Sequence, residues 1–225
     1  MLKLLIAPQT RIGMTTKELQ AYLRDVHGPL CLAQRDVGRY FRQYIHHYSL
    51  TAGADPLLAK PPLRRDAITS ITFDDLAGFQ ASTSSEGYRT KVGPDEASFS
   101  VREDPLFFFV QPHTIARGRP IDGLKIFHFR KGRADADLAQ VSAEWRGRLA
   151  QVLTLPGAVP LANYVHNVVV PAGPQPAPFD MIDEILIDEA SDIAVAQRAL
   201  REAEEGLFDQ GVTVAMVTKP HIFIP

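Results

Sequence analysis

Four residues in the first half of the chain combine types and spacing that suit proton transfer. His27 ends a predicted helix, and Tyr44, His46 and Tyr48 alternate along a predicted strand. Because successive strand side chains point to opposite faces, the last three share one face. An imidazole exchanges protons near neutral pH, and a phenol hydroxyl in a dry pocket stabilises an enolate or phenolate oxygen. The pattern indicates acid/base chemistry beside a carbonyl or phenol.

Each of these positions also has a structural interpretation. A histidine at a helix end suits the negative pole of the helix dipole. Tyrosine and histidine are amphipathic residues that fit a half-wet strand surface. The other face of the same strand carries His47, which becomes the reserve candidate if that face lines the pocket. The sequence leaves both questions open.

A second set of residues is predicted to contact a substrate, namely Tyr22, Tyr164, His166 and Glu184. Glu184 interrupts an otherwise apolar predicted strand. A carboxylate on an interior strand face would have its pKa raised by burial, as a general base requires. The alternative for Glu184 is an ion pair with Arg146 or Arg148. His113 and His221 each follow a predicted final strand at the same place in the two halves, which favours a structural or hinge role.

The two halves of the chain repeat one another. Residues 44–48 read Tyr-Ile-His-His-Tyr, and residues 164–168 read Tyr-Val-His-Asn-Val. A repeat unit of this length is longer than a solenoid unit and indicates a duplicated small domain. We therefore predict two domains, 1–117 and 118–225. The copies are unequal, since Arg146 stands in the place of His27, so one copy is expected to be specialised for chemistry.

Hydrophobic periodicity predicts the order β-α-β-β-α-β in each half. Thr15 or Thr16 is expected to cap the first helix, with Glu18 in its first turn, and Gly28-Pro29 to end or kink it. The predicted strands and helices of the first half are 2–7, 15–30, 41–50, 67–73, a helix from about 76, and 106–110, with 51–65 as a loop and 82–105 as a long polar excursion. Those of the second half are 124–129, 135–153, 161–170, 180–187, 190–206 and 212–218.

This element order predicts an α+β fold of two ferredoxin-like modules, each with an antiparallel sheet covered on one face by two helices. The open faces of two such sheets can cover each other, so a pseudo-dimeric α+β barrel is expected. The net charge of −2 and the absence of a basic run argue against nucleic acid and anionic membranes as partners. The single cysteine, Cys31, precludes an internal disulfide, and no apolar run reaches membrane-span length, so a cytoplasmic location is expected.

The first half resembles an EthD domain. The resemblance lies in GMTTKELQAYLRDVHGPL, in QYIHHY, and in Asp66-Ala67-Ile68 followed by Phe73-Asp74-Asp75. EthD domains belong to the dimeric α+β barrel superfamily, in which single modules form homodimers, so this chain is similar to a fused dimer. The matching histidine, His27 here, is catalytic in some relatives. Three positions of the first half depart from the family pattern: His46 replaces a glutamine, Tyr48 replaces a histidine, and Ser70 replaces a glutamate that the second half keeps as Glu184.

The resemblance implies several activities, among them lactone isomerases, polyketide dehydratases and decarboxylases, cofactor-free monooxygenases and haem enzymes. We predict a cofactor-independent lyase or isomerase that acts on a small aromatic, polyketide or lactone-like molecule, with His27 as the main acid/base. The alternatives are a carrier for a hydrophobic or aromatic ligand and a haem-binding oxidoreductase. No metal site is expected, and a homodimer of the whole chain is possible.

Overall fold

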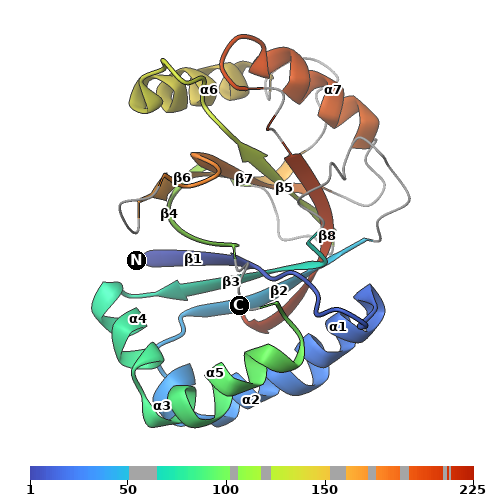
Figure 1. The fold of residues 1–225 in the computed structure, drawn as a ribbon. Helices are drawn as coiled ribbons and strands as arrows, with labels where there is room; N and C mark the ends of the chain where they lie inside the picture. The colour runs from blue at the N-terminus through green and yellow to red at the C-terminus, as the bar shows by residue number, and fades with distance from the viewer. Residues whose placement is uncertain are drawn as a thin grey trace. The chain divides into compact units, whose positions relative to one another are not determined.

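The computed structural model describes residues 1–50, 65–101, 106–117, 123–152, 161–171, 176–187, 193–209, 212 and 214–225 (Figure 1). Residues 51–64 of the predicted loop 51–65 lie outside the described residues. The predicted domain boundary at 117/118 lies at the edge of the gap 118–122. The chain divides into two compact units, which are described one at a time. Unit 1 holds the described residues up to Val110 together with Lys219–Pro225, and unit 2 holds Gln111–Thr218.

The elements up to residue 117 are β1 (Leu2–Ala7), α1 (Thr16–Tyr22), the π-turn η1 (Leu23–His27), α2 (Gly28–Ala33), α3 (Arg35–Gly38), β2 (Gln43–Ser49), β3 (Ala67–Phe73), α4 (Leu76–Thr83), the π-turn η2 (Tyr88–Val92), α5 (Gly93–Asp95), the 3₁₀ turn η3 (Glu96–Ser98) and β4 (Leu106–Arg117). The later elements are β5 (Leu124–Arg130), α6 (Leu138–Val152), β6 (Leu161–Val170), β7 (Met181–Ile187), α7 (Ile193–Glu204) and β8 (Val214–Ile224).

The strands pair in the order β1-β3-β2-β8-β5-β7-β6-β4, which closes as an eight-stranded antiparallel barrel. Within unit 1 the order is β4-β1-β3-β2, and within unit 2 it is β8-β5-β7-β6. Strand β4 passes from unit 1 to unit 2 after Val110, and β8 passes back after Thr218. Both strands are longer than predicted, because each serves the sheets of both units.

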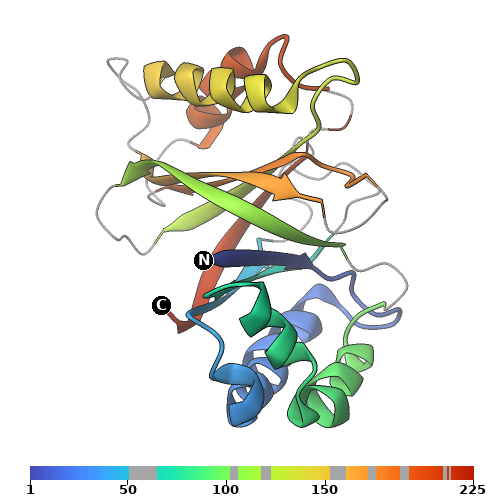
Figure 2. The ribbon, with the colours of Figure 1, turned by 90° about the vertical axis from the view of Figure 1, so that its left-hand side faces the viewer.

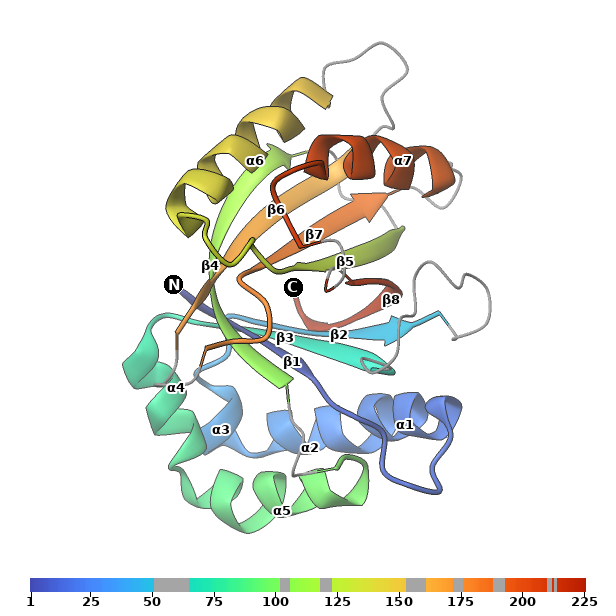
Figure 3. The same cartoon turned by 45° about the horizontal axis from the view of Figure 1, so that its top comes forward.

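In unit 1 the helices lie on one face of the sheet, as Figures 2 and 3 both show. The helix–sheet core there is built from apolar and aromatic side chains, among them Leu4, Val37, Phe41, Tyr44 and Phe73. In the pairing of β2 with β3, Tyr44 lies opposite Ile71 and His46 opposite Thr69. Because alternate strand residues share a face, Tyr44 and His46 both meet the helices.

The helix starts agree with their capping signals. Thr15 accepts a hydrogen bond from the backbone of Glu18, whose carboxylate accepts one from the backbone of Thr15, so the predicted capping box is present. Asp75 caps α4 by accepting from the backbone of Gly78 at 2.8 Å. Each cap satisfies backbone N–H groups that the first turn leaves unpaired.

Of the two outcomes predicted for Gly28-Pro29, an end or a kink of the first helix, the end does not occur. The backbone N–H of Gly28 reaches the carbonyl of Leu23, five residues earlier, and the helix continues to Ala33. Pro29 has no N–H, so a wider π-turn before it re-pairs the backbone that an α-turn would leave unmet. The same event occurs at Gly93-Pro94, where Gly93 bonds the carbonyl of Tyr88. Within the described part of the predicted polar excursion, residues 82–101, most residues are helical.

In unit 2, α6 and α7 cover one face of the sheet of β5, β6 and β7 (Figure 1). Trp145, Tyr164, Ile185 and Leu200 contribute to its core. Helix α6 begins at Leu138, three residues after the predicted start at Asp135. Asp137 precedes its first turn and accepts from the backbone of Ala139 at 2.9 Å. Among the described residues, no helix is long and apolar enough to cross a membrane.

Candidate functional site

His27 sits in the π-turn η1, with its side chain buried between helix and sheet. Its Nδ1 lies 2.8 Å from Oδ2 of Asp95, and the hydroxyl of Tyr22 donates to Oδ1 of the same carboxylate at 2.5 Å. A carboxylate accepts hydrogen bonds, so Nδ1 of a neutral His27 carries the proton. Nε2 is then the nitrogen that can accept one, and the ring is held in place as in other acid/base histidines.

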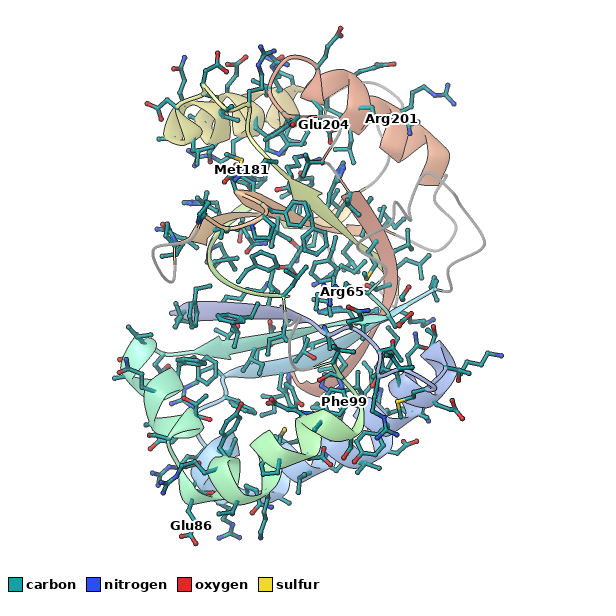
Figure 4. The ribbon with its side chains drawn as sticks, viewed as in Figure 1. Arg65, Glu86, Phe99, Met181, Arg201 and Glu204 are labelled. Atoms are coloured by element: carbon teal, nitrogen blue, oxygen red, sulfur yellow. The ribbon has the colours of Figure 1, made fainter. Side chains whose placement is uncertain are left out.

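The basic nitrogen of His27 faces a buried thiol. Cys31, one helical turn later, places Sγ 3.6 Å from His27 Nε2. Burial raises the pKa of this thiol to about 12, so it is protonated at neutral pH. The ring of Phe99 packs on the side of His27 with centroids 4.7 Å apart and completes an apolar surround (Figure 4).

Tyr44, His46 and Tyr48 lie on one face of β2, in agreement with the predicted alternation. Nε2 of His46 is 2.9 Å from the Tyr44 hydroxyl, and Nδ1 is 3.4 Å from the Tyr48 hydroxyl. Tyr44 and His46 are fully buried, whereas Tyr48 is half-buried. Both ring nitrogens of His46 are therefore engaged, and the row leads from the core toward solvent.

Burial sets the protonation states along this row. Burial, with smaller contributions from the nearby His27 and His221, lowers the pKa of His46 to about 3. Burial also raises the pKa of Tyr44 and of Tyr48. At neutral pH His46 is thus uncharged and both phenols keep their protons, so this row can donate hydrogen bonds to a developing oxyanion. His46 cannot serve as an acid near neutrality, which leaves His27 as the better candidate for proton transfer.

Two residues of β8 in unit 1 complete the aromatic row. Phe223 stacks on Tyr44 with centroids 5.0 Å apart and meets the edge of His46 at 4.8 Å. His221 stacks on Tyr48 at 6.0 Å and contacts Phe223 edge-on at 4.8 Å. The site of unit 1 thus draws on a helix, a strand and a distant segment of the chain.

The second-half candidates form a separate, fully buried network in unit 2. His166 bonds through Nδ1 to Asp183 at 2.6 Å and through Nε2 to Ser142 at 2.9 Å. Asp183 is also paired with Arg130, which bonds Glu204 at 2.5 Å; Glu204 is labelled in Figure 4. Burial alone would raise the pKa of Asp183, but Arg130 and His166 outweigh it and bring the pKa down to about 2.

The other predicted substrate contacts have structural partners. Tyr164 is fully buried in the core of unit 2, where burial raises its pKa. Glu184 forms its salt bridge with Lys125, at 2.9 Å, and accepts from Asn167. Of the two arginines predicted as its partners, Arg146 donates to the carbonyl of Ser142, and Arg148 bonds Glu144 and the carbonyls of Ala203 and Glu205. Tyr22 belongs to the site of unit 1, as a partner of Asp95.

Three members of the unit 1 site escaped the sequence prediction, namely Cys31, Asp95 and Phe223. A signal for Asp95 exists. The chain reads His27-Gly28-Pro29 on one helix and Val92-Gly93-Pro94-Asp95 on another, and both Gly-Pro pairs follow a π-turn. Such turns recur at functional sites, so the second Gly-Pro pair would have directed attention to its acidic neighbour.

His46 and His166 fit haem poorly. An axial ligand needs an imidazole nitrogen that faces open space. Both nitrogens of His46 and of His166 are engaged. We therefore derive no step through haem. No group of three or more metal-ligating side chains occurs within the described ranges.

Comparison with known proteins supports the fold and part of the sequence. Residues 11–103 match the model of the EthD domain, whereas comparison with curated proteins finds no match. The chain is similar to the solved structure of an anthrone oxidase-like protein, with a TM-score of 0.63 and 8% identity over 98% of this chain and 92% of that one.

Two further solved structures resemble it at a TM-score of 0.55. One is a proposed monooxygenase from Lactobacillus acidophilus NCFM, 7% identical over 97% of this chain and 92% of that one. The other is a proposed chlorite dismutase, 8% identical over 98% and 94%. Identities this low show the fold alone. The segment 11–103, which matches the model of the EthD domain, holds His27, His46 and Asp95.

Proposed function

We propose that unit 1 is an acid/base catalytic site that removes a proton beside a carbonyl or phenol of a small, largely apolar aromatic, polyketide or lactone-like molecule. The observation that carries this proposal is the Tyr22–Asp95–His27 arrangement. It fixes the imidazole with Nε2 as the accepting nitrogen, inside an apolar surround. General acid/base groups need this combination of orientation and partial desolvation.

The remaining residues of the site supply oxyanion stabilisation. When Nε2 of His27 takes a proton from carbon, negative charge develops on the substrate oxygen. The protonated hydroxyl of Tyr48, which is half-buried and backed by neutral His46, is the donor nearest to solvent. A fixed donor in a site of low dielectric stabilises such an oxygen more strongly than water does. Return of the proton elsewhere on the molecule gives isomerisation, and loss of a leaving group gives elimination.

A second candidate starts from the same proton removal. The similarity to proteins described as anthrone oxidase-like and as a monooxygenase supports an oxidative outcome. In this outcome the carbanion forms a C–O bond to dioxygen and the resulting peroxide takes up a proton. Cleavage of the O–O bond, with loss of a second proton from the same carbon, then releases water and leaves a carbonyl. Both outcomes use the same base and the same oxyanion donor. They differ in whether dioxygen is consumed.

The test is a screen of aromatic, polyketide and lactone metabolites for binding by thermal shift, followed by product analysis with and without dioxygen. His27→Gln is expected to lower kcat/KM about 10²-fold or more. The matched control is His113→Gln, a half-buried histidine of unit 2. Equal rates for the two variants would remove His27 from the mechanism. Dependence on dioxygen selects the oxidative outcome, and tight binding without conversion under both atmospheres would replace catalysis by a carrier role.

We also infer that the chain holds two copies of one β-α-β-β-α-β module. The strand orders β4-β1-β3-β2 and β8-β5-β7-β6 support this, because each places the fourth strand of a half beside the first. Association of two whole chains stays a prediction, and light scattering would measure it.

A further inference from the structure

Phe223 occupies an unusual place in unit 1. Its ring is apolar, yet two of the side chains it covers are a buried phenol and a buried imidazole. It stacks on Tyr44 with an interplanar angle of 24° and meets His46 at 71°. Tyr44 and His46 bond to each other, so the ring of Phe223 lies flat on one member and edge-on to the other member of a polar pair that needs no further partner from it. A planar ring with a hydroxyl or carbonyl substituent would make the same contacts.

The backbone next to His27 is shaped for this ring. A Cβ added to Gly28 would lie 2.3 Å from Cζ of Phe223 and within 3 Å of two further ring carbons. Real Cβ atoms do not come so close, so the glycine admits the ring directly beside the candidate base. Gly28 has a helical backbone that any residue could adopt. Its lack of a side chain therefore matters for space and not for conformation.

The ring also stands between the buried end of the row and its open end. Tyr44 and His46 are buried, whereas Phe223, Tyr48 and His221 are half-buried. Aromatic stacking and edge contacts of this kind are attractive beyond the area that they bury. The aromatic ring of a ligand could make the same contacts with Tyr44, His46 and His221 that Phe223 makes. Replacing the Phe223 ring by the ligand ring therefore changes the contact energy little.

We propose that the space bounded by Gly28, Tyr44, His46 and His221 is the seat for the flat aromatic ring of the ligand, and that Phe223 holds this seat when no ligand is bound. The ligand class is a planar phenol or enolisable aryl ketone of one to three rings. The oxygen of the ligand would lie toward Tyr48. This inference rests on the proposed function for the choice of ligand, but it is tested by binding and needs no turnover.

The first test uses the full chain with 4-fluorophenylalanine in place of its twelve phenylalanines and 1-naphthol as the probe. Phe223→Leu assigns the ¹⁹F resonance of position 223. Saturating 1-naphthol is expected to move that resonance toward the shift of the unfolded chain. Binding that leaves the resonance in place, or no binding at millimolar 1-naphthol, would overturn the proposal.

The second test compares affinities by titration calorimetry. Because Phe223 competes for the seat, Phe223→Ala is expected to bind 1-naphthol about tenfold more tightly than the wild type. The matched control is Ile222→Ala, an exposed neighbour on β8, which should bind as the wild type does. If Phe223→Ala does not fold, Phe223→Leu serves in its place and should also bind more tightly. A folded variant with no gain contradicts the proposal.

Two comparisons separate the seat from an ordinary apolar cavity. Naphthalene lacks the oxygen, so Phe223→Ala should favour 1-naphthol over naphthalene, and equal affinities would contradict the seat. Gly28→Ala added to Phe223→Ala fills the floor of the seat and should abolish the gain. The same titrations in His27→Gln keep the two proposals apart. If His27→Gln still binds 1-naphthol with displacement of Phe223 and its turnover is unchanged, His27 is not the catalytic base. The proposal of an aromatic-ring site would then still stand.

Discussion

Nδ1 of His27 lies 2.8 Å from Oδ2 of Asp95, although the two residues stand 68 positions apart. Two π-turns make this contact possible. One contains His27 and is followed by Gly28-Pro29, and the other precedes Gly93-Pro94-Asp95. Each inserts one extra residue into a helical turn and so shifts the residues after it around the helix. The pairing of a base with its orienting carboxylate is a consequence of these two insertions.

Asp95→Asn should uncouple this pair without removing the imidazole. An amide can donate to Nδ1, so the proton of His27 is expected to redistribute between its two nitrogens. The ¹⁵N shifts of the ring would report this directly. With a turned-over substrate, kcat should fall about 10²-fold or more while KM changes little. Asp25→Asn, which changes an exposed carboxylate in the π-turn that contains His27, is the control. Equal kcat in the two variants would leave Asp95 a purely structural role.

The sequence predicted those parts of the fold that depend on neighbouring residues, such as alternation along a strand or a capping residue before a helix. The strands 67–73 and 161–170 follow from alternation, and the capping box follows from Thr15 and Glu18. The alternation also placed Tyr44, His46 and Tyr48 together. Asp95 was missed because its partner is distant in sequence, and Phe223 because β8 runs on past Thr218 into the other unit. A contact between residues that are distant in sequence depends on the path of the whole chain, so the residues near each partner do not predict it.

The buried state of His46 predicts a loss of stability in acid. Its pKa is about 3 in the folded chain and about 6.5 when unfolded. Between these values the unfolded chain binds a proton that the folded chain does not. The stabilisation that comes from keeping His46 neutral is therefore fully present above pH 6.5. As pH falls from about 6.5 toward 3, the free energy of unfolding decreases by about 1 kcal/mol for each pH unit.

Urea unfolding at pH 4, 5, 6 and 7 would measure this dependence. His46→Gln keeps hydrogen-bonding capacity but has no titrating ring, so its free energy of unfolding should vary less over that range. His128, whose pKa is also lowered by burial, contributes to the same window in both proteins and cancels in the comparison. Parallel curves for wild type and variant would show that His46 titrates normally in the folded chain.

The buried network of unit 2 predicts a large penalty for breaking one ion pair. Arg130 and Asp183 are both fully buried, and Asp183 also accepts from Trp145 at 2.8 Å. Asp183→Asn leaves Arg130 with a single carboxylate, Glu204, in a medium of low dielectric. The free energy of unfolding should fall by about 3–5 kcal/mol. Asp135→Asn, in an exposed pair with Arg133, should change it by less than about 1 kcal/mol.

Cys31 provides a check on the resting state of His27. The thiol lies 3.6 Å from Nε2, and two protonation states of the pair are conceivable: a neutral thiol beside a neutral imidazole, or a thiolate beside an imidazolium. Burial raises the pKa of the thiol to about 12 and so favours the neutral pair. Only the neutral pair leaves Nε2 able to accept a proton from a substrate.

Alkylation by iodoacetamide distinguishes the two states, because the thiolate is the reacting form. At pH 8 the native chain should react at least about 10²-fold more slowly than the same chain unfolded in urea, for which a thiol pKa of about 8.5 applies. His27→Gln should not slow the native reaction further, since no imidazolium supports the thiolate. Fast native alkylation that disappears in His27→Gln would instead establish the ion pair, and it would remove His27 as the resting base.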